Sequence, residues 1–278
     1  MNISFIGTGI MATAIIKSIL DHNLFKEEEI MGSFHRDKNA QEIKDHYRIN
    51  TTTSNIEAAK FGDIVVFSIK PQVFESVANE VKDYIKDSQL VMSIMAGIDI
   101  ETLQKNLLHK KVVRCMPNTP AQIGKGMTVW TATKEVEENT KESVKQILSS
   151  LGDEMYVDDE VYVDMATAIS GTGPAYVFLF LESLINAGVH LGFSRKDSTE
   201  LVYKTTLGSV LFAIQSGKHT SELRDMVTSP GGTAADALYE LEKGGFRTVL
   251  EKAVYAAYQR TNYLKDLNKK KGAQNGRV

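Results

Sequence analysis

The first 160 residues alternate between short apolar runs and segments whose apolar side chains recur at helical spacing. The runs typical of buried strands cover residues 2–6, 29–34, 64–69, 90–94, 112–115, 128–132 and 154–157. After the first run, residues 13–20 carry apolar side chains three and four positions apart, and a polar helix is expected at 136–151. Strands that alternate with helices in this way predict a mostly parallel, doubly wound α/β sheet.

Strand signals stop near residue 161, and the rest of the chain has helical patterns. Pro174 is placed to open a helix that ends before Gly192, and Ser194 caps a second helix that ends near Gly217. Helical spacing then continues over residues 221–227, 234–243 and 246–267. The C-terminal part is therefore predicted to be all-helical.

These patterns divide the chain into an α/β domain at 1–160, a helical domain at 161–267 and a polar tail at 268–278. The tail is expected to be solvated and frayed. In the first helix of the helical domain, apolar side chains such as Val177 and Phe178 cover more than one side, which favours burial between subunits. Burial within one chain is the alternative that the sequence leaves open.

Composition and charge exclude several classes of protein. The 32 basic and 35 acidic residues are interspersed and give a net charge of −3, so a general nucleic-acid binder is not expected. The six histidines show no metal-ligand spacing, and no metal is expected. The apolar stretch 175–181 is too short to cross a bilayer, and no secretory signal precedes the first strand. A cytoplasmic protein with a small-molecule substrate is the simplest expectation.

A glycine-rich turn follows the first predicted strand and opens the first predicted helix. Gly7 permits a tight turn, Gly9 lets the backbone approach a phosphate, and Ala12 allows close packing of helix on strand. With Ile10 and Met11, these residues form the N-terminal helix turn at which a dinucleotide pyrophosphate binds. The context of strand, turn and helix predicts a Rossmann-type domain that binds NAD(P). A purely structural glycine turn is the alternative.

The residues after the second strand bear on the choice between NAD and NADP. An NAD site normally has an acidic residue at this strand end, where this chain has Ser33, His35 and Arg36. Arg36 can stack on adenine and pair with a 2′-phosphate, with Ser33, His35 or Lys38 assisting. Asp37 comes after the arginine and is expected in a loop. NADPH is therefore expected to be preferred over NADH.

Several later motifs are more specific than the glycine turn. They are SIKP at 68–71, SIMAG at 93–97, RCMPNTP at 114–120, SGTGPAY at 170–176 and TSPGGT at 228–233, followed by GGFR at 244–247. In this order and at these separations they resemble the pyrroline-5-carboxylate reductase family, and the resemblance covers residues 1–264. It implies a Rossmann-type domain followed by a helical dimerisation domain, and the last step of proline biosynthesis.

The resemblance also implies roles for residues in these motifs. Phe67, Ser68, Ile69, Lys70, Pro71, Ala96 and Gly97 should line the ribose and nicotinamide; Asn55 should lie on the adenosine side; and Met116, Asn118 and Thr119 should lie near the nicotinamide. Without the resemblance, each of these residues has a structural explanation, such as ending a strand or filling space in the core.

Two of the reactive side chains are not expected to perform chemistry. Lys70 precedes a proline at a strand end, and we expect it to contact the cofactor rather than to act as an acid. Cys115 has no evident base partner, and hydride transfer needs no nucleophile, so a buried structural thiol is expected.

The resemblance implies that the substrate is a five-membered cyclic imine with one carboxylate. A loop formed by Ser229, Gly231, Gly232 and Thr233 exposes backbone N–H groups before a helix, which is typical of an anion site. Family members commonly have a threonine hydroxyl where this chain has Ala234. Thr233 is the remaining candidate for a catalytic hydroxyl, although adjacent helical residues point about 100° apart.

The predicted activity is direct hydride transfer from NAD(P)H to the imine carbon, without a metal or a covalent intermediate. The resemblance further implies a homodimer, which in this family can assemble into a decamer. Alternatives are a divergent paralogue that reduces a related imine and a regulatory protein that binds NADP without turnover. A β-hydroxyacid dehydrogenase is disfavoured, because no lysine follows the glycine-rich segment 171–174.

Overall fold

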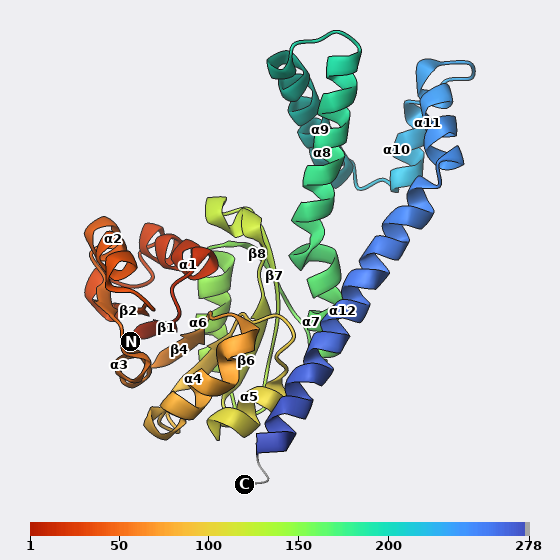
Figure 1. The fold of residues 1–278 in the computed structure, drawn as a ribbon. Coiled ribbons are helices and arrows are strands. Elements are labelled where there is room, and N and C mark those ends of the chain that lie inside the picture. Colours follow the sequence, from red (N-terminus) through yellow and green to blue (C-terminus); the bar gives the residue numbers. More distant parts are fainter. Residues whose placement is uncertain (276–278) are drawn as a thin grey trace. The chain divides into compact units, whose positions relative to one another are not determined.

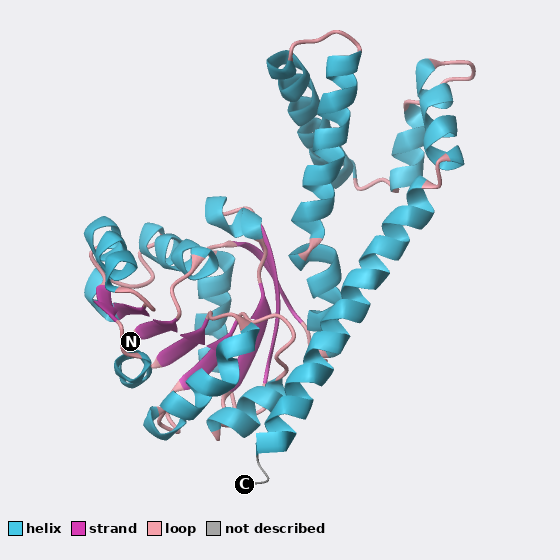
Figure 2. Cartoon of the chain, in the orientation of Figure 1, coloured by secondary structure: helices cyan, strands magenta, loops and turns pink. Residues whose placement is uncertain are grey.

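A computed structural model describes residues 1–275, apart from the side chain of Asp37 and the side chains from residue 270 onward. The chain forms two compact units (Figures 1 and 2). The first combines Met1–Gly173 with the part of the chain that begins at Ala256, and the second is Pro174–Tyr255. Strands occur only in the first unit, as far as the structure describes the chain (Figure 2).

One eight-stranded sheet forms the centre of the first unit, in the order β3-β2-β1-β4-β5-β6-β7-β8. Neighbouring strands are parallel except for β6 and β7, which are antiparallel. The strands are β1 (Ile3–Ile6), β2 (Ile30–Ser33), β3 (Asn50–Thr52), β4 (Ile64–Phe67), β5 (Leu90–Ser93), β6 (Val112–Met116), β7 (Gly126–Ala132) and β8 (Gly152–Tyr156). The order reverses between β1 and β4, which is where doubly wound sheets bind ligands.

Helices cover both faces of the sheet. They are α1 (Ile10–Asp21), α2 (Asp37–Tyr47), α3 (Asn55–Phe61), α4 (Phe74–Val81), α5 (Ile100–Leu107), α6 (Glu138–Ser149) and α7 (Val161–Ala166), with the π-helix η5 (Thr167–Gly171) after α7. Short 3-10 helices are η1 (Glu27–Glu29), η2 (Pro71–Val73), η3 (Lys82–Tyr84) and η4 (Thr119–Ile123).

The core has two layers, because side chains alternate between the faces of each strand. Ile3 and Phe5 pack with α1 and α6, whereas Ile6 packs with α3, α4 and α5 on the other face. Both faces of the central strands are therefore buried, which explains their continuous apolar runs. The predicted doubly wound α/β fold is confirmed.

Four parts of the sequence-based prediction differ from the structure. β3 was not predicted, because its residues are polar and half-buried. Asp37 is the first residue of α2 rather than part of a loop. The expected domain boundary at residue 160 is displaced to Gly173, since α7 packs with the sheet. The expected frayed tail is instead a continuation of α12 (Phe246–Asn275), and residues 276–278 lie outside the described residues.

A buried group of charges attaches α7 and α12 to β6. The Arg114 side chain is 1% exposed and donates to Glu160 Oε1 at 2.7 Å and to Asp164 Oδ1 at 2.6 Å. The second oxygen of Asp164 accepts from Lys265 Nζ at 2.7 Å. Burial disfavours the charge on Arg114, but the two carboxylates outweigh it and raise the pKa of the guanidinium.

The second unit consists of α8 (Gly173–His190), α9 (Arg195–Ser216), α10 (Thr220–Met226), α11 (Thr233–Lys243) and the beginning of α12. The predicted caps are confirmed: Ser194 accepts from the N–H of Asp197, and Gly217 ends α9 in the left-handed region. Only Ile185 and Ser198 are buried between Pro174 and Tyr255.

The helical stretch Val161–His190 is longer than the apolar run noted in the sequence. By length and composition alone it is long and apolar enough to cross a membrane, and 11% of its most apolar window is buried. It is the one such helix among the described residues. Core helices of soluble proteins meet the same criterion.

We predict that His109 makes the first unit less stable in mild acid. His109 is buried and its Nε2–H donates to the Gln89 carbonyl oxygen at 2.9 Å; burial lowers its pKa below the ordinary value of 6.5. Below about pH 6.5 the unfolded chain therefore binds a proton that the folded chain does not, and the free energy of unfolding falls by up to about 1.4 kcal/mol per pH unit.

Urea unfolding of His109→Gln between pH 5 and 7.5 tests this prediction, because the amide keeps an N–H donor and does not titrate. The pH dependence should flatten in this variant and persist in a control, His190→Gln, which changes an exposed histidine. Equal pH dependence in all three proteins would contradict it.

Candidate cofactor and substrate sites

The turn between β1 and α1 has the backbone shape that a dinucleotide site needs. Gly7 has a φ of +84°, and a Cβ at this position would collide with Ile69 Cγ2. Around Gly9, by contrast, no atom lies within 4 Å of an added Cβ. Gly7 is therefore required by the fold, whereas Gly9 leaves open space beside the helix start.

The beginning of α1 offers free donors to an anion. Its first residue after the Gly9 cap is Ile10, which is 74% exposed, and no side chain accepts a hydrogen bond at the cap. The first turn holds no acidic residue. Ala12 is buried in the core, as the glycine motif predicts. The residues present fit a pyrophosphate bound at this helix N-terminus.

A pocket of about 460 Å³ opens at this turn. It is lined by Thr8, Gly9, Ile10, Thr13, Ala14, Lys17, Phe34, Asn39, Glu42, Ile43, Tyr47 and Gln122. Most of these residues were not predicted from the sequence. Gln122 lies in η4, more than a hundred positions after the glycine turn, and no local pattern connects the two segments.

A chain of hydrogen bonds joins the glycine turn to α3 and α4. Ser33 Oγ accepts from the Gly7 N–H at 3.0 Å and donates to Asn55 Oδ1 at 2.8 Å. Asn55 Nδ2 in turn donates to Glu80 Oε2 at 2.9 Å. The Ser33 hydroxyl thus links the glycine turn to Asn55 at the start of α3.

The segment after β2 exposes two basic side chains. His35 and Arg36 are both exposed, and Arg36 precedes α2 in an extended conformation without capping it. The Lys38 ammonium lies 4.0 Å from Glu42 on the same helix. His35 and Arg36 are therefore the groups of this segment that are placed to meet a ligand beside β2.

The ends of β4 and β5 lie next to the glycine turn. Ser68 Oγ donates to the Gly7 carbonyl at 2.6 Å, and Lys70 is exposed before Pro71 at the start of η2. Ala96 is half-buried. Phe67, which was expected to line the cofactor, is instead fully buried and packs edge-on against Phe74, because it points to the opposite face of the sheet from its neighbours.

The end of β6 is held by polar contacts to more distant segments. Asn118 Nδ2 donates to the Ser170 carbonyl at 3.1 Å, and Asn118 Oδ1 accepts from the Met127 N–H at 2.9 Å. Met116 is half-buried against Gly171, where a Cβ would lie 2.9 Å from its Cε. The Asn118 side chain thus joins the end of β6 to η5 and to β7.

Cys115 is an inert thiol. It is buried, its Sγ–H donates to the Ser93 carbonyl at 3.3 Å, and burial raises its pKa to about 12. The thiolate that a nucleophile requires is therefore absent at neutral pH. The expectation of a structural thiol agrees with these contacts.

In the second unit, the loop between α10 and α11 has the geometry of an anion-binding turn. Gly231 has a φ of +71°, and Gly232 caps α11 without any side-chain hydrogen bond. A Cβ on Gly232 would lie 2.5 Å from Ser229 Oγ, so the serine hydroxyl folds closely over this glycine. The Gly232 N–H donates to the Ser229 carbonyl, and the N–H groups of Ala235 and Asp236 donate to the Gly232 carbonyl. The N–H groups of Thr233 and Ala234 remain to face a carboxylate, although the first turn also carries the acidic Asp236.

Thr233 and Ala234 are the first two residues of α11. The Thr233 side chain is exposed and Ala234 is half-buried. The two Cα–Cβ directions differ by about 100° in a helix, so the Thr233 hydroxyl does not occupy the place that a hydroxyl at position 234 would take.

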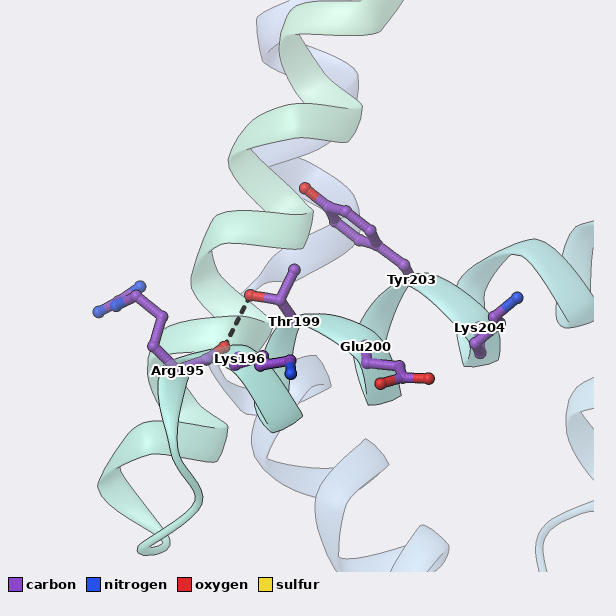
Figure 3. Close-up of a pocket in the computed structure, with 6 residues that line it drawn as sticks. All are labelled: Arg195, Lys196, Thr199, Glu200, Tyr203 and Lys204. Carbon is purple, nitrogen blue, oxygen red and sulfur yellow. Dashed lines mark hydrogen bonds between the residues drawn. The ribbon is translucent and has the colours of Figure 1, made fainter.

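A shallow depression on α9 is a less convincing site (Figure 3). Its lining residues are Arg195, Lys196, Thr199, Glu200, Tyr203 and Lys204. All lie on one side of a single helix, and the one hydrogen bond drawn among them joins Thr199 Oγ1 to the Arg195 carbonyl. A surface formed by one helix lacks the converging groups of a catalytic pocket. Among the described residues, no group of three or more potential metal ligands occurs.

Two family models match the two halves of the chain. Residues 160–264 match the family described as pyrroline-5-carboxylate reductase dimerisation. Residues 2–97 match the family described as NADP oxidoreductase, coenzyme F420-dependent. The nucleotide-binding half and the helical half are thus recognised separately.

Whole-length relatives agree with these matches. The chain is 34% identical over 262 residues to the pyrroline-5-carboxylate reductase of Arabidopsis thaliana, covering 94% of this chain and 95% of the relative. It is 37% identical over 263 residues to that of Pseudomonas aeruginosa, covering 94% and 96%. The solved pyrroline carboxylate reductase of Plasmodium falciparum, with NADP bound, superposes with a TM-score of 0.88 at 37% identity over 95% and 98% of the two chains. The chain is an oxidoreductase of the pyrroline-5-carboxylate reductase family.

Proposed function

We propose that this chain reduces pyrroline-5-carboxylate to proline with NADPH. The proposal is supported by two helix N-termini without side-chain caps, at Gly9 and Gly232, in a chain with whole-length similarity to such reductases. The first suits a dinucleotide pyrophosphate and the second suits a substrate carboxylate.

The first unit would hold the cofactor along the carboxyl ends of its strands. Gly7, Gly9, Ile10, Met11 and Ala12 form the pyrophosphate turn. The residues expected beyond it are His35, Arg36 and Asn55 on the adenosine side and Ser68, Ile69, Lys70, Pro71, Ala96, Gly97, Met116 and Asn118 on the nicotinamide side. When bound, the reduced nicotinamide supplies the hydride.

The loop before α11 would bind and orient the substrate. Ser229, Gly231, Gly232 and Thr233 offer hydroxyl and backbone N–H donors to its carboxylate. These donors hold the substrate without a hydroxyl on the imine nitrogen, so turnover does not depend on a single hydroxyl. Thr233 is the candidate group for the imine nitrogen.

Preference for NADPH rests on charge. Arg36 is exposed beside β2, and it is not part of a described ion pair. A guanidinium pairs well with the dianionic 2′-phosphate of NADP, whereas NAD offers only hydroxyls at this position.

A homodimer, which can in turn assemble into a decamer, best explains the second unit. Its exposed apolar side chains include Val177, Phe178, Leu179, Leu201, Leu207 and Ile214. A helical unit with two buried residues has no core of its own, and the family model matched here is a dimerisation domain. In the cytoplasm, a second copy covers these faces.

Light scattering in detergent-free buffer should give a multiple of the 30.8 kDa chain mass. A monomer, or a need for detergent, would contradict the dimer.

Purified protein should oxidise NADPH when pyrroline-5-carboxylate is added and form an equal amount of proline. Absorbance at the nicotinamide band together with chromatography of the product measures both. Tight NADPH binding without turnover would favour a regulatory protein, and turnover only with other cyclic imines would favour a divergent paralogue. Either result would contradict the proposed function.

Arg36→Ala should lower kcat/KM for NADPH about ten- to a hundredfold and leave that for NADH nearly unchanged, since a hydrogen bond to a charged group contributes about 1.5–3 kcal/mol. Steady-state kinetics with both cofactors measures the ratio. The matched control is Lys44→Ala, which removes an exposed charge from α2 away from the ligand. Parallel losses with both cofactors would show that Arg36 does not select NADP.

Ala234→Thr should raise kcat about ten- to a hundredfold, because the added hydroxyl restores a hydrogen bond of about 1.5–3 kcal/mol that acts on the imine. Ala235→Thr, which adds the same side chain about 100° around α11, should not raise it. Equal rates for Ala234→Thr and the unmodified chain would show that position 234 does not contact the reacting nitrogen.

A further inference from the structure

The last turns of α12 hold the turn that follows β5. Gly97 has a φ of +72°, and its carbonyl oxygen accepts from Asn268 Nδ2 at 2.9 Å. A Cβ at position 97 would lie 3.0 Å from Leu264 Cβ, so the helix packs directly on this backbone. Leu264 belongs to the helix that the sequence predicted, whereas Asn268 is the first residue of the tail that was expected to be frayed.

Ion pairs on either side of these contacts fix α12 in place. Lys269 Nζ lies 2.9 Å from Asp99 and 2.6 Å from Glu101, at the start of α5. Asp99 also accepts from the Thr102 N–H and thereby caps α5. Lys265 pairs with the buried Asp164 one helical turn earlier. Asn268 is thus held in register against Gly97 by contacts on both sides.

The Gly97 turn borders the half of the crevice that receives the nicotinamide. The pyrophosphate belongs at the β1–α1 turn, and the adenosine half lies towards β2, so the other half must extend over the ends of β4 and β5. The Ile94 N–H donates to the Phe67 carbonyl and joins these two strand ends. Asn268 lines a small cavity together with Pro71 and Ile98, one from each of the two loops.

We propose that Asn268 is a positioning residue for the nicotinamide half of the cofactor. Its amide fixes the Gly97 carbonyl, and with it the turn from Ala96 to Ile98, in the shape that receives the nicotinamide riboside. The C-terminal helix therefore takes part in cofactor binding without touching the cofactor. This inference rests on the proposed dinucleotide binding.

Asn268→Ala tests the proposal by comparing two ligands in calorimetry. The Kd for NADPH should rise about two- to tenfold, which corresponds to one hydrogen bond, whereas the Kd for 2′,5′-ADP, which lacks the nicotinamide half, should stay the same. Asn268→Asp keeps the size of the side chain and removes the donor, so it should weaken NADPH binding at least as much.

Asn50→Ala is the matched control, because Asn50 Nδ2 donates to the Glu28 carbonyl at 2.9 Å at the opposite end of the sheet. It should change neither Kd, even where its thermal midpoint falls as much as that of Asn268→Ala. Unchanged NADPH affinity in Asn268→Ala, or equal losses for the two ligands, would overturn the proposal. An unmodified chain that fails to bind NADPH would instead overturn the proposed function itself.

Discussion

The buried ion pair between Arg114 and Asp164 is the interaction on which the arrangement of the first unit depends. Both side chains are 1% exposed, and a buried charge of this kind is tolerated only when it is fully paired. Glu160 and Lys265 complete the pairing, so that β6, α7 and α12 are tied together at one point. The same point fixes the strand end that leads to Met116 and Asn118.

Segments from both ends of the sequence contribute to the candidate cofactor site. The N-terminal turn at Gly7 and Gly9 presents the pyrophosphate donors, and Ser33 and Asn55 brace it from behind. The C-terminal helix, held by Lys265 and Lys269, supports the Gly97 turn. Because these two turns are hydrogen-bonded to neighbouring elements, their backbone is held in the shape that the cofactor needs.

Local patterns were enough to predict most of the sheet and the turn at Gly7, because strand burial and glycine geometry act over a few residues. β3 escaped because its polar residues show no such pattern. The expectation of a frayed tail was wrong because Asn268 and Lys269 find partners far away in sequence. The compact units divide at Gly173, whereas the matched dimerisation family begins at residue 160, where the sequence predicts the boundary. The hydrogen bonds from Ser33 to Asn55 and from Asn118 to Ser170 likewise join residues far apart in sequence, and no local sequence pattern predicts such contacts.

The path of the hydride is the most direct test of the proposed chemistry. NADPH carrying deuterium at the transferred position of the nicotinamide, incubated with the protein and pyrroline-5-carboxylate in ordinary water, should give proline with one deuterium at the former imine carbon. That result requires both reactants to meet in one site and the hydride to pass directly between them. Proline without deuterium, or no proline while NADPH is bound, would contradict direct hydride transfer by this chain.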